Sequence, residues 1–464
     1  MAAAAVVALV LTALSGRYGY ARDELYFRLL EPAWGYVDQP PLVPLVAELL
    51  GEHQALLRVP ATAAAAASVV LVALLVRELG GSPFAQGWAA WAYAGTTACL
   101  NFGHVLLTSA FDLVLWPWVC LLVVRAELRD RPRLWLLAGA VAGVATYNKL
   151  LIAVLLVGIA VGLAVLGPRQ RLASPYVIGG GVVAIVIGSP NLVYQATHGW
   201  PQLAMGAALS ENNAGEVRWF MWVLLALVLG PPLVWVWGHG LVALGRREDW
   251  RAVRFLLPAF VVVLLFTFVS GAQPHYPTFL LIVVLAAGVA ELDGRLDRAR
   301  WRWLLGVNAA VSVVVSLPVL PLSVLGETPV PELNLLAADQ VGWPTYAAQV
   351  AAVHSSVAAD QHPVVVTSNY GEAGAVARFA SNVPVYSGHN ALHGEARPPD
   401  HTRTVVMVGE QLVAVRHLFA TCRVVDRLDN GVGVDNEEQG VPVALCADPV
   451  RPWGGLWPEF RHLD

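Results

Sequence analysis

Long apolar runs recur along this chain and constrain its fold more than any other feature. The chain is 57% hydrophobic and 13% charged, which is about half the charged share of a soluble globular domain. Runs of membrane-spanning or nearly membrane-spanning length are separated by short polar stretches. They predict a mostly α-helical, polytopic membrane protein with roughly 11 spans. The first run could instead be a signal peptide. The runs lie at 1–14, 60–79, 83–101, 104–124, 134–148, 150–167, 174–193, 217–240, 253–271, 276–292 and 302–322.

Arginines mark every second connection between these runs. The positive-inside rule places such connections in the cytoplasm, so the alternate connections, including the first loop at 15–59, are predicted to face outward. An odd number of spans then puts the C-terminal part outside the cell membrane as well. The Arg-rich connections contain Arg77, Arg125 to Arg133, Arg169 with Arg171, Arg246 to Arg254, and Arg295 to Arg302.

The character of the chain changes near residue 328. Apolar runs shorten to strand length in PVVVTS, RTVVMVG and CRVVDRL, and helix-like stretches such as GEAGAVARFA lie between them. This alternation is typical of an α/β domain. The sequence therefore predicts a transmembrane domain over 1–327 and an extracytoplasmic α/β domain over 328–464.

The four cysteines indicate packing and a possible disulfide rather than a metal site. Cys99 and Cys120 lie in apolar runs and are expected to pack there. Cys422 and Cys446 lie in the C-terminal part, where an extracytoplasmic location would allow a disulfide. No cysteine spacing typical of metal sites, Walker loop, GxGxxG turn or GxSxG elbow stands out, and no basic patch favours nucleic acid.

The first predicted outer loop carries the candidate chemistry, in RDELY and PAWGYVDQPPL. Residues 22–31 fit a short surface helix, on which Glu24 and Arg28 could pair at i and i+4. Asp23 lies about 100° around the helix from Glu24 and is outside that pair. A carboxylate at a membrane edge is costly, so we expect Asp23 to have a function. Asp38 precedes Gln-Pro-Pro-Leu and has a structural alternative as the N-cap of a helix that ends at Gly51.

Two further charged residues interrupt apolar surroundings. Asp112 lies inside the run HVLLTSAFDLVLWPWV, where a carboxylate must face a cavity or a polar partner such as Thr108 or Ser109. Lys149 is the single lysine in a chain whose other basic residues are all arginine. It lies at a predicted outward turn, where it could hold a phosphate as a point charge or extend to the interface. His198 and His275 lie in other predicted outer segments, without a metal-type spacing.

The acidic pair Asp23-Glu24 with Tyr26, followed by WGYVDQPPL, resembles the GT-C superfamily of polytopic glycosyltransferases. The closer resemblance is to the branch of protein O-mannosyltransferases and lipid A aminoarabinose transferases. TSAFD at Asp112, YNK at Lys149 and QATHGWP at His198 resemble the same branch. The resemblance covers roughly residues 15–280.

This resemblance implies an inverting transfer of a hexose or pentose from a polyprenyl-phosphate donor to a lipid, glycan or protein acceptor at the outer face. Asp23 would act as base or orient the acceptor, with Glu24 and Asp112 as further catalytic carboxylates. Lys149 would stabilise the departing phosphate. Tyr26, Asp38, His198 and His275 would contact substrate. Some relatives use a divalent metal, so a metal is possible here, and no other cofactor is implied.

Two alternatives remain open from the sequence. A transporter or flippase for a lipid-linked or small polar substrate would also place carboxylates and a lysine along a membrane cavity, although such sites usually lie near the midplane between repeats. A non-catalytic assembly protein with an outer domain is the third interpretation. In the C-terminal domain, Tyr370, His389 and Asn390 are possible contacts to an acceptor, or turn residues.

Overall fold

A computed structural model of the protein describes residues 1–51, 53–295 and 298–464. Residue 52 of the first predicted loop and residues 296–297 of the last Arg-rich connection lie outside this description. The chain forms two compact units. The helical unit contains 1–15, 39–43 and 58–317, and the sheet unit contains 16–38, 44–57 and 318–464. Most of the first predicted outer loop thus belongs to the same unit as the C-terminal part.

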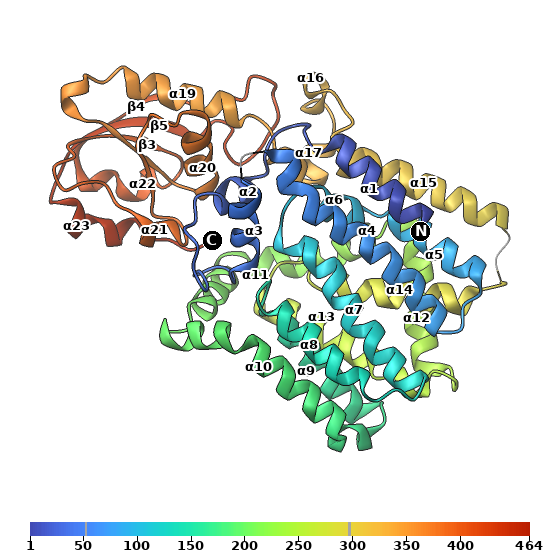
Figure 1. The fold of residues 1–464 in the computed structure, drawn as a ribbon. Coiled ribbons are helices and arrows are strands. Elements are labelled where there is room, and N and C mark those ends of the chain that lie inside the picture. The colour runs from blue at the N-terminus through green and yellow to red at the C-terminus, as the bar shows by residue number, and fades with distance from the viewer. Residues whose placement is uncertain (52, 296–297) are drawn as a thin grey trace. The chain divides into compact units, whose positions relative to one another are not determined.

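Helices make up almost all of the regular structure before residue 322 (Figure 1). The α-helices of this part are α1 (Ala2–Leu14), α2 (Arg22–Phe27), α3 (Leu42–Leu50), α4 (Gln54–Glu78), α5 (Pro83–Ala94), α6 (Thr97–His104), α7 (Thr108–Leu128), α8 (Leu134–Ala145), α9 (Ile152–Val165), α10 (Pro175–Thr197), α11 (Pro201–Leu227), α12 (Val234–Arg246), α13 (Leu256–Ser270), α14 (Thr278–Leu292) and α15 (Arg298–Ser316). Three 3-10 turns are η1 (Arg169–Ala173), η2 (Pro231–Leu233) and η3 (Arg251–Val253).

Every predicted apolar run coincides with one or more of these helices. The predicted number of membrane spans, roughly 11, is not confirmed. Among the described residues, four helices are long and apolar enough to cross a membrane: Gln54–Glu78, Thr108–Leu128, Pro175–Thr197 and Arg251–Ser270. A fifth span would be the pair Val217–Leu227 and Pro231–Arg246, which is bent by 83°. Other apolar helices are shorter than a bilayer requires by themselves. These are α1, α8, α9 and α14.

The bend between α11 and α12 follows from its local sequence, Gly230-Pro231-Pro232. Gly230 has a φ of 96°, which favours glycine, and the prolines lack the N–H groups that would continue a helix. The buried Asn308 donates through Nδ2 to the carbonyl oxygens of Leu229, at 3.2 Å, and Gly95, at 3.0 Å. An amide side chain therefore satisfies one backbone acceptor at the break, Leu229, and one at the end of α5, Gly95, inside an apolar unit.

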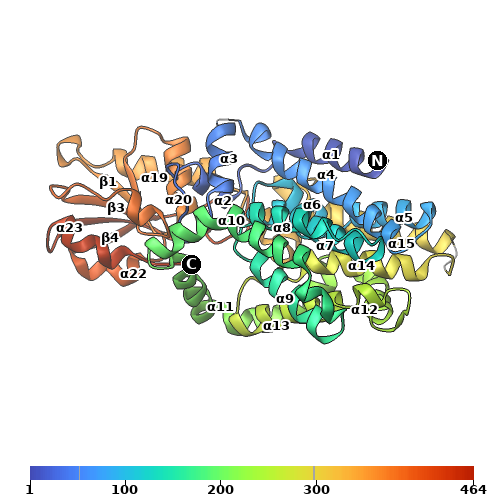
Figure 2. The ribbon, with the colours of Figure 1, turned by 60° about the horizontal axis from the view of Figure 1, so that its bottom comes forward.

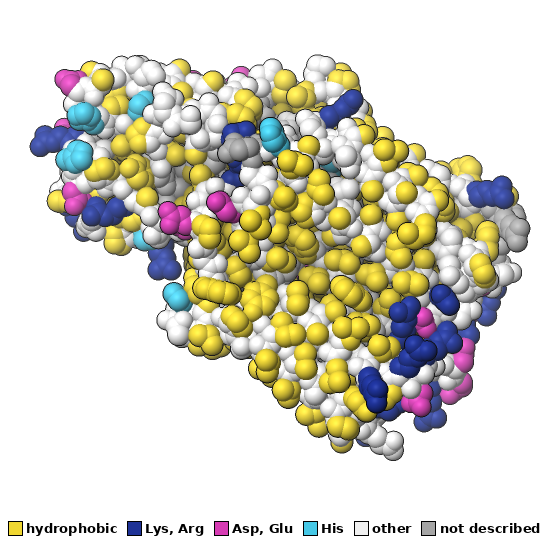
Figure 3. Space-filling model, viewed as in Figure 1, with side chains coloured by type: hydrophobic (Ala, Val, Ile, Leu, Met, Phe, Trp, Pro, Cys, Tyr) yellow, Lys and Arg dark blue, Asp and Glu magenta, His cyan; other side chains and the backbone are white. Residues whose placement is uncertain are grey.

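Helix α14 forms the centre of the helical unit. All but one of its residues are buried, as expected for a helix that is apolar on every side. The face drawn in Figure 3 is apolar over this unit, and its charged side chains gather at one end, near the C-terminal end of α7. Ion pairs link residues of the predicted cytoplasmic connections: Arg125–Glu78 at 2.8 Å, Arg129–Glu78 at 2.9 Å and Arg171–Glu127 at 3.0 Å.

The sheet unit combines α2 and most of α3, from Pro44 onward, with a C-terminal α/β region (Figure 2). Its strands are β1 (Val364–Thr367), β2 (Val385–Ser387), β3 (Thr404–Val408), β4 (Phe419–Arg427) and β5 (Pro442–Pro449). Its later helices are α16 (Leu322–Leu325), α17 (Val330–Leu333), α18 (Leu335–Ala338), α19 (Trp343–Ser355), α20 (Tyr370–Phe379), α21 (Leu392–Glu395), α22 (Leu412–Val415) and α23 (Trp453–Leu456), with 3-10 turns η4 (Ala359–Gln361), η5 (Arg416–Leu418) and η6 (Trp457–Phe460).

The five strands form one mixed sheet in the order β2-β1-β3-β5-β4. β1 pairs in parallel with β2 and β3, whereas β5 runs antiparallel to β3 and β4. Figures 1 and 2 show α19 and α20 on one side of the sheet and α22 and α23 on the other. Burial on both faces explains why β1 reads as a continuous run of valines. The predicted strands in PVVVTS, RTVVMVG and CRVVDRL correspond to β1, β3 and β4, and the helix-like stretch GEAGAVARFA corresponds to α20. β2 and β5 complete the sheet.

Cys422 and Cys446 form a disulfide and face each other in the β4–β5 register. Cys99 and Cys120 are free and buried, as predicted. Closing a loop of this size restricts the unfolded chain, so replacing both Cys422 and Cys446 with alanine should lower the free energy of unfolding of the sheet unit by about 3 kcal/mol. Chemical denaturation of the purified protein, followed by tryptophan fluorescence, measures this loss. Dithiothreitol should destabilise the natural protein but not the double variant; equal effects on both would contradict the prediction.

Candidate functional site

Helix α2 presents the acidic pair of the first loop, and it is shorter than predicted. It spans Arg22–Phe27 rather than 22–31, since Pro32 disfavours helical backbone at Glu31 and the chain leaves the helix before it. Glu24 is buried, and its Oε2 accepts a hydrogen bond from the Ala21 N–H at 2.8 Å. Arg28 donates to the Gly51 carbonyl oxygen. The predicted Glu24–Arg28 pair stays a prediction, while Glu24 helps to start the helix.

Asp23 is partly exposed and lies against α20 of the same unit. The Tyr370 hydroxyl donates a hydrogen bond to Asp23 Oδ1 at 2.9 Å, across 347 residues of sequence. The Tyr370 ring stacks on His389 at 4.8 Å between centroids, and His389 stacks on His462 at 4.5 Å. The backbone N–H of Tyr370 donates to His389 Nδ1 at 3.2 Å. Two of the predicted acceptor-contacting residues are therefore next to the predicted base.

Arg22 gathers several carboxylates beside Asp23. Its Nη2 lies 3.3 Å from Glu438 and 3.9 Å from Asp339, and it also pairs with Glu437. Burial raises the pKa of Asp339 to about 7, although Arg22 opposes the shift. Burial likewise raises the pKa of Glu372 to about 8, against the backbone N–H groups of Asn369 and Ser368. This part of the unit is acidic and poorly solvated, with one guanidinium at its centre.

Tyr26 and Asp38 are close to this group. The Tyr26 ring lies 4.5 Å from the Tyr370 ring, and the Tyr26 hydroxyl accepts a hydrogen bond from the Ala391 N–H at 3.3 Å. Burial raises the pKa of Tyr26 well above its usual range, and the Asp38 carboxylate raises it further. Asn390, with a φ of 49°, instead pairs with the backbone of Asp464.

The alternative role of Asp38 as a helix cap is wrong. Helix α3 begins at Leu42, four residues after Asp38. Pro41 disfavours helical backbone at Pro40, so the helix begins only after the second proline. Gly51, with a φ of 48°, follows the end of the helix as predicted.

The helical unit brings together Asp112 and the turn that carries Lys149. Asp112 is buried in the second turn of α7, and its Oδ1 accepts a hydrogen bond from Asn148 Nδ2 at 3.0 Å. The same amide group donates to the Thr108 carbonyl oxygen at 3.0 Å. The polar partner of Asp112 therefore comes from the α8–α9 turn rather than from the side chain of Thr108 or Ser109.

Lys149 follows directly after this asparagine and lies half-buried over an aromatic ring. Its Nζ is 4.6 Å from the centroid of the Tyr276 ring, a cation–π arrangement. His275, the neighbour of Tyr276, lies 3.0 Å through Nε2 from Ser109 Oγ on α7. Lys149, Asp112 and His275 thus lie around the same end of α7. His198 is exposed at the end of α10, where its ring stacks on Tyr194.

Arg58 is a buried cation that the sequence interpretation passed over. It lies in α4, is fully buried, and donates through Nη1 to the Ser15 carbonyl oxygen at 2.7 Å. The same atom lies 3.2 Å from His104 Nε2. An arginine in the first turns of an apolar helix indicates either a function or a buried polar contact. The position of Arg58 directly before the apolar run at 60–79 could therefore have identified it from the sequence.

Among the described residues, no group of three or more His, Cys, Asp or Glu side chains is arranged to hold a metal ion. The possible divalent metal therefore has no assigned ligands among these described residues.

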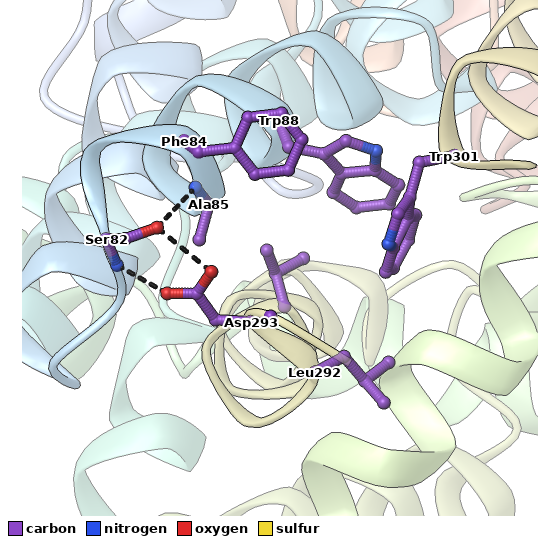
Figure 4. A pocket seen from close by; sticks show the side chains of 9 residues that line it. Ser82, Phe84, Ala85, Trp88, Leu292, Asp293 and Trp301 are labelled. Atoms are coloured by element: carbon purple, nitrogen blue, oxygen red, sulfur yellow. Dashed lines mark hydrogen bonds between the residues drawn. The ribbon is translucent and has the colours of Figure 1, made fainter. Parts of the chain in front are cut away.

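A pocket between α5 and α14 contains none of the predicted site residues (Figure 4). Its rim includes Asp293, whose carboxylate accepts hydrogen bonds from Ser82 N at 2.7 Å and from Ser82 Oγ at 2.9 Å. Trp88 and Trp301 pack edge to face on the other side, at 3.8 Å between centroids. The carboxylate links the start of α5 to the end of α14, and we assign this pocket a structural role.

Part of the chain matches the model of a known protein family. Residues 38–194 match the family model of dolichyl-phosphate-mannose-protein mannosyltransferases. No curated protein matches the chain.

Similar solved structures cover most of the chain. The crystal structure of ArnT from Cupriavidus metallidurans bound to undecaprenyl phosphate has a TM-score of 0.60 at 15% identity, and the match covers 95% of this chain and 97% of ArnT. The arabinofuranosyltransferase AftD from Mycobacteria has a TM-score of 0.52 at 15% identity, over 97% of this chain and 40% of AftD. The Archaeoglobus fulgidus oligosaccharyltransferase, in a complex with Zn and sulfate, has a TM-score of 0.50 at 10% identity, over 89% of this chain and 69% of the relative.

Proposed function

From its GT-C glycosyltransferase fold and its mannosyltransferase-type domain at 38–194, we propose that this chain transfers a sugar from a polyprenyl-phosphate donor. The acceptor would be a lipid, glycan or protein at the outer face of the membrane. The observation that carries the proposal is the fold match over nearly the whole length of ArnT, a protein whose crystal structure holds undecaprenyl phosphate. The sugar would be a hexose or a pentose.

The proposed step is a direct displacement with inversion. The acceptor hydroxyl oxygen bonds to the anomeric carbon of the donor sugar while the bond from that carbon to the phosphate oxygen breaks. The hydroxyl proton passes to the Asp23 carboxylate, which acts as general base. Polyprenyl phosphate departs with the electron pair of the broken bond.

Lys149 would stabilise the charge that develops on the departing phosphate. An ammonium group placed at such a point acts as an electrostatic partner of the leaving group. The Asp112–Asn148 hydrogen bond supports this role, because it ties the turn before Lys149 to α7 at 3.0 Å. Tyr26, Asp38, His198 and His275 stay proposed substrate contacts, and Glu24 helps to hold the helix of the base.

We propose the topology that the sequence predicts, with about eleven crossings and the C-terminal domain outside the cytoplasm. The shorter apolar helices α1, α8, α9 and α14 would complete the spans by thinning the bilayer or by packing within the unit. The Cys422–Cys446 disulfide supports an oxidising compartment for the sheet unit.

The test uses purified protein in liposomes with undecaprenyl-phosphate sugars labelled on the sugar, as a panel of hexosyl and pentosyl donors. An envelope extract supplies acceptors. We expect at least one donor to be cleaved, with label transferred to acceptor and undecaprenyl phosphate released. Movement of an intact donor across the bilayer, without cleavage, would favour the transporter or flippase instead. No cleavage of any donor would contradict the proposal.

A further inference from the structure

Helix α2 packs closely on α20, and glycines on α20 permit this contact (Figures 1 and 2). A Cβ atom at Gly374 would lie 2.7 Å from Leu25 Cβ and 2.8 Å from the Leu25 carbonyl oxygen. A Cβ atom at Gly371 would lie 2.4 Å from Arg22 Cγ. These distances are below van der Waals contact. A side chain at 374 would displace the α2 backbone at Leu25, and one at 371 would displace the side chain of Arg22. The two positions are three residues apart and share one face of α20.

Three residues of α2 make polar contacts at this surface in addition to the close packing: Arg22, Asp23 and Tyr26. Arg22 pairs with carboxylates of the C-terminal region, at 3.3 Å to Glu438 and 3.9 Å to Asp339. The Tyr26 hydroxyl accepts from Ala391 N–H, and the Tyr370 hydroxyl donates to Asp23. Contacts on both sides of Asp23 in sequence therefore come from residues more than 300 positions away.

We propose that the C-terminal α/β domain is the platform that positions Asp23, and that Tyr370 is the positioning residue that orients its carboxylate. This inference rests on the proposed role of Asp23 as base. It gives the domain a direct role in catalysis, in place of acceptor selection alone.

The chemistry of Tyr370 suits this role. Its hydroxyl fixes one carboxylate oxygen of Asp23 at 2.9 Å and so restricts the rotation of the carboxylate. Burial raises the pKa of Tyr370 well above its usual range, and the Asp23 charge raises it further, so the hydroxyl stays a donor at neutral pH. A hydrogen bond to a carboxylate favours its charged form, which is the form that accepts a proton.

A purely structural role for the α2–α20 contact makes a different prediction. Removal of the Tyr370 hydroxyl would then change stability without changing the pH dependence of the reaction. The charged and titratable groups next to Tyr370 or Asp23 include Arg22, Tyr26, Asp339 and His389. Around Arg22 lie also Glu372, Glu437 and Glu438. Burial lowers the pKa of His389 to about 3, so this ring stays neutral across the range tested.

The first test compares Tyr370→Phe with Tyr386→Phe in the full-length protein. Tyr386 packs against the core of the same domain and serves as the matched control. We expect Tyr370→Phe to lower kcat about tenfold, the usual effect of losing a hydrogen bond to a charged group, with donor KM unchanged. The acidic limb of the pH–rate profile should move to higher pH, whereas the Tyr386 variant should behave as the natural protein.

The second test displaces α2 without touching Asp23 or Tyr370. Gly374→Ala should lower kcat at least tenfold, because the Leu25 backbone must move, while Gly394→Ala, which has open space around it, should have no effect. An unchanged kcat and an unchanged pH profile in Tyr370→Phe would overturn the positioning role, even if Gly374→Ala fails to fold. Failure of the proposed function can be distinguished from failure of the positioning role, because in the first case the natural protein itself would cleave no donor.

Discussion

Replacing Asp23 with asparagine should reduce sugar transfer about 10³-fold, within the range that general base catalysis contributes. Asparagine keeps the shape of the side chain and an oxygen that can accept the Tyr370 hydrogen bond. It cannot take the proton of the acceptor hydroxyl. Donor KM should therefore change little, because the loss falls on the chemical step. Initial rates of transfer from labelled donor in liposomes, across donor concentrations, measure kcat and KM separately.

The control for this change is Asp360→Asn, an exposed aspartate of the same unit in η4. It alters charge by the same amount and should leave the rate unchanged. The two variants should have the same unfolding midpoint within the small range typical of surface substitutions. Transfer at the natural rate by Asp23→Asn would show that another group removes the proton, and Asp112 would be the next candidate.

Replacing Lys149 with methionine should lower kcat/KM for the donor about 10²–10³-fold, the usual effect of removing one electrostatic partner of a developing charge. Methionine keeps an unbranched apolar stem, so the packing over Tyr276 is largely retained, while the ammonium 4.6 Å from that ring is lost. Lys149→Arg should keep part of the activity, because it keeps the charge but presents a planar fork instead of a point charge. Competition by free undecaprenyl phosphate measures whether phosphate binding itself is weakened.

The matched control is Arg416→Met, at an exposed position of the sheet unit. It removes one positive charge from a basic side chain of similar length and should leave donor kinetics unchanged. If Lys149→Met binds undecaprenyl phosphate and turns over donor as the natural protein does, the phosphate role is wrong. Lys149 would then be an interface residue that extends to water.

The helical elements were predictable because apolar periodicity and length are local properties. Each predicted run contains a helix. The run at 217–240, predicted as one span, is instead interrupted at Gly230-Pro231-Pro232, because proline lacks the N–H group that would continue a helix. The number of membrane crossings could not be predicted from the same runs, because short helices such as α14 are apolar by virtue of burial inside the unit. Burial in protein and exposure to lipid select the same residues.

Candidate site residues could be selected from the sequence, and their roles stay predictions, but their spatial arrangement could not be predicted. Asp23, Asp112 and Lys149 attract attention because charge in apolar surroundings is costly. The errors were local: a proline ended α2 early and moved the start of α3, so Asp38 lost its role as a cap. Arg58 could have been noted as a cation beside an apolar run, but its contacts with Ser15 and His104, which are distant in sequence, could not be predicted.

The sequence alone determined that this chain has apolar helices, arginine-rich connections, a small α/β region and an acidic first loop, since each depends on neighbouring residues. Only the tertiary structure decided that the first loop folds with the C-terminal region. Gly374 permits the approach of Leu25, and Tyr370 donates to Asp23 across 347 residues. Such contacts depend on the complementary surfaces of α2 and α20. The local sequence of either helix does not predict that it packs against the other.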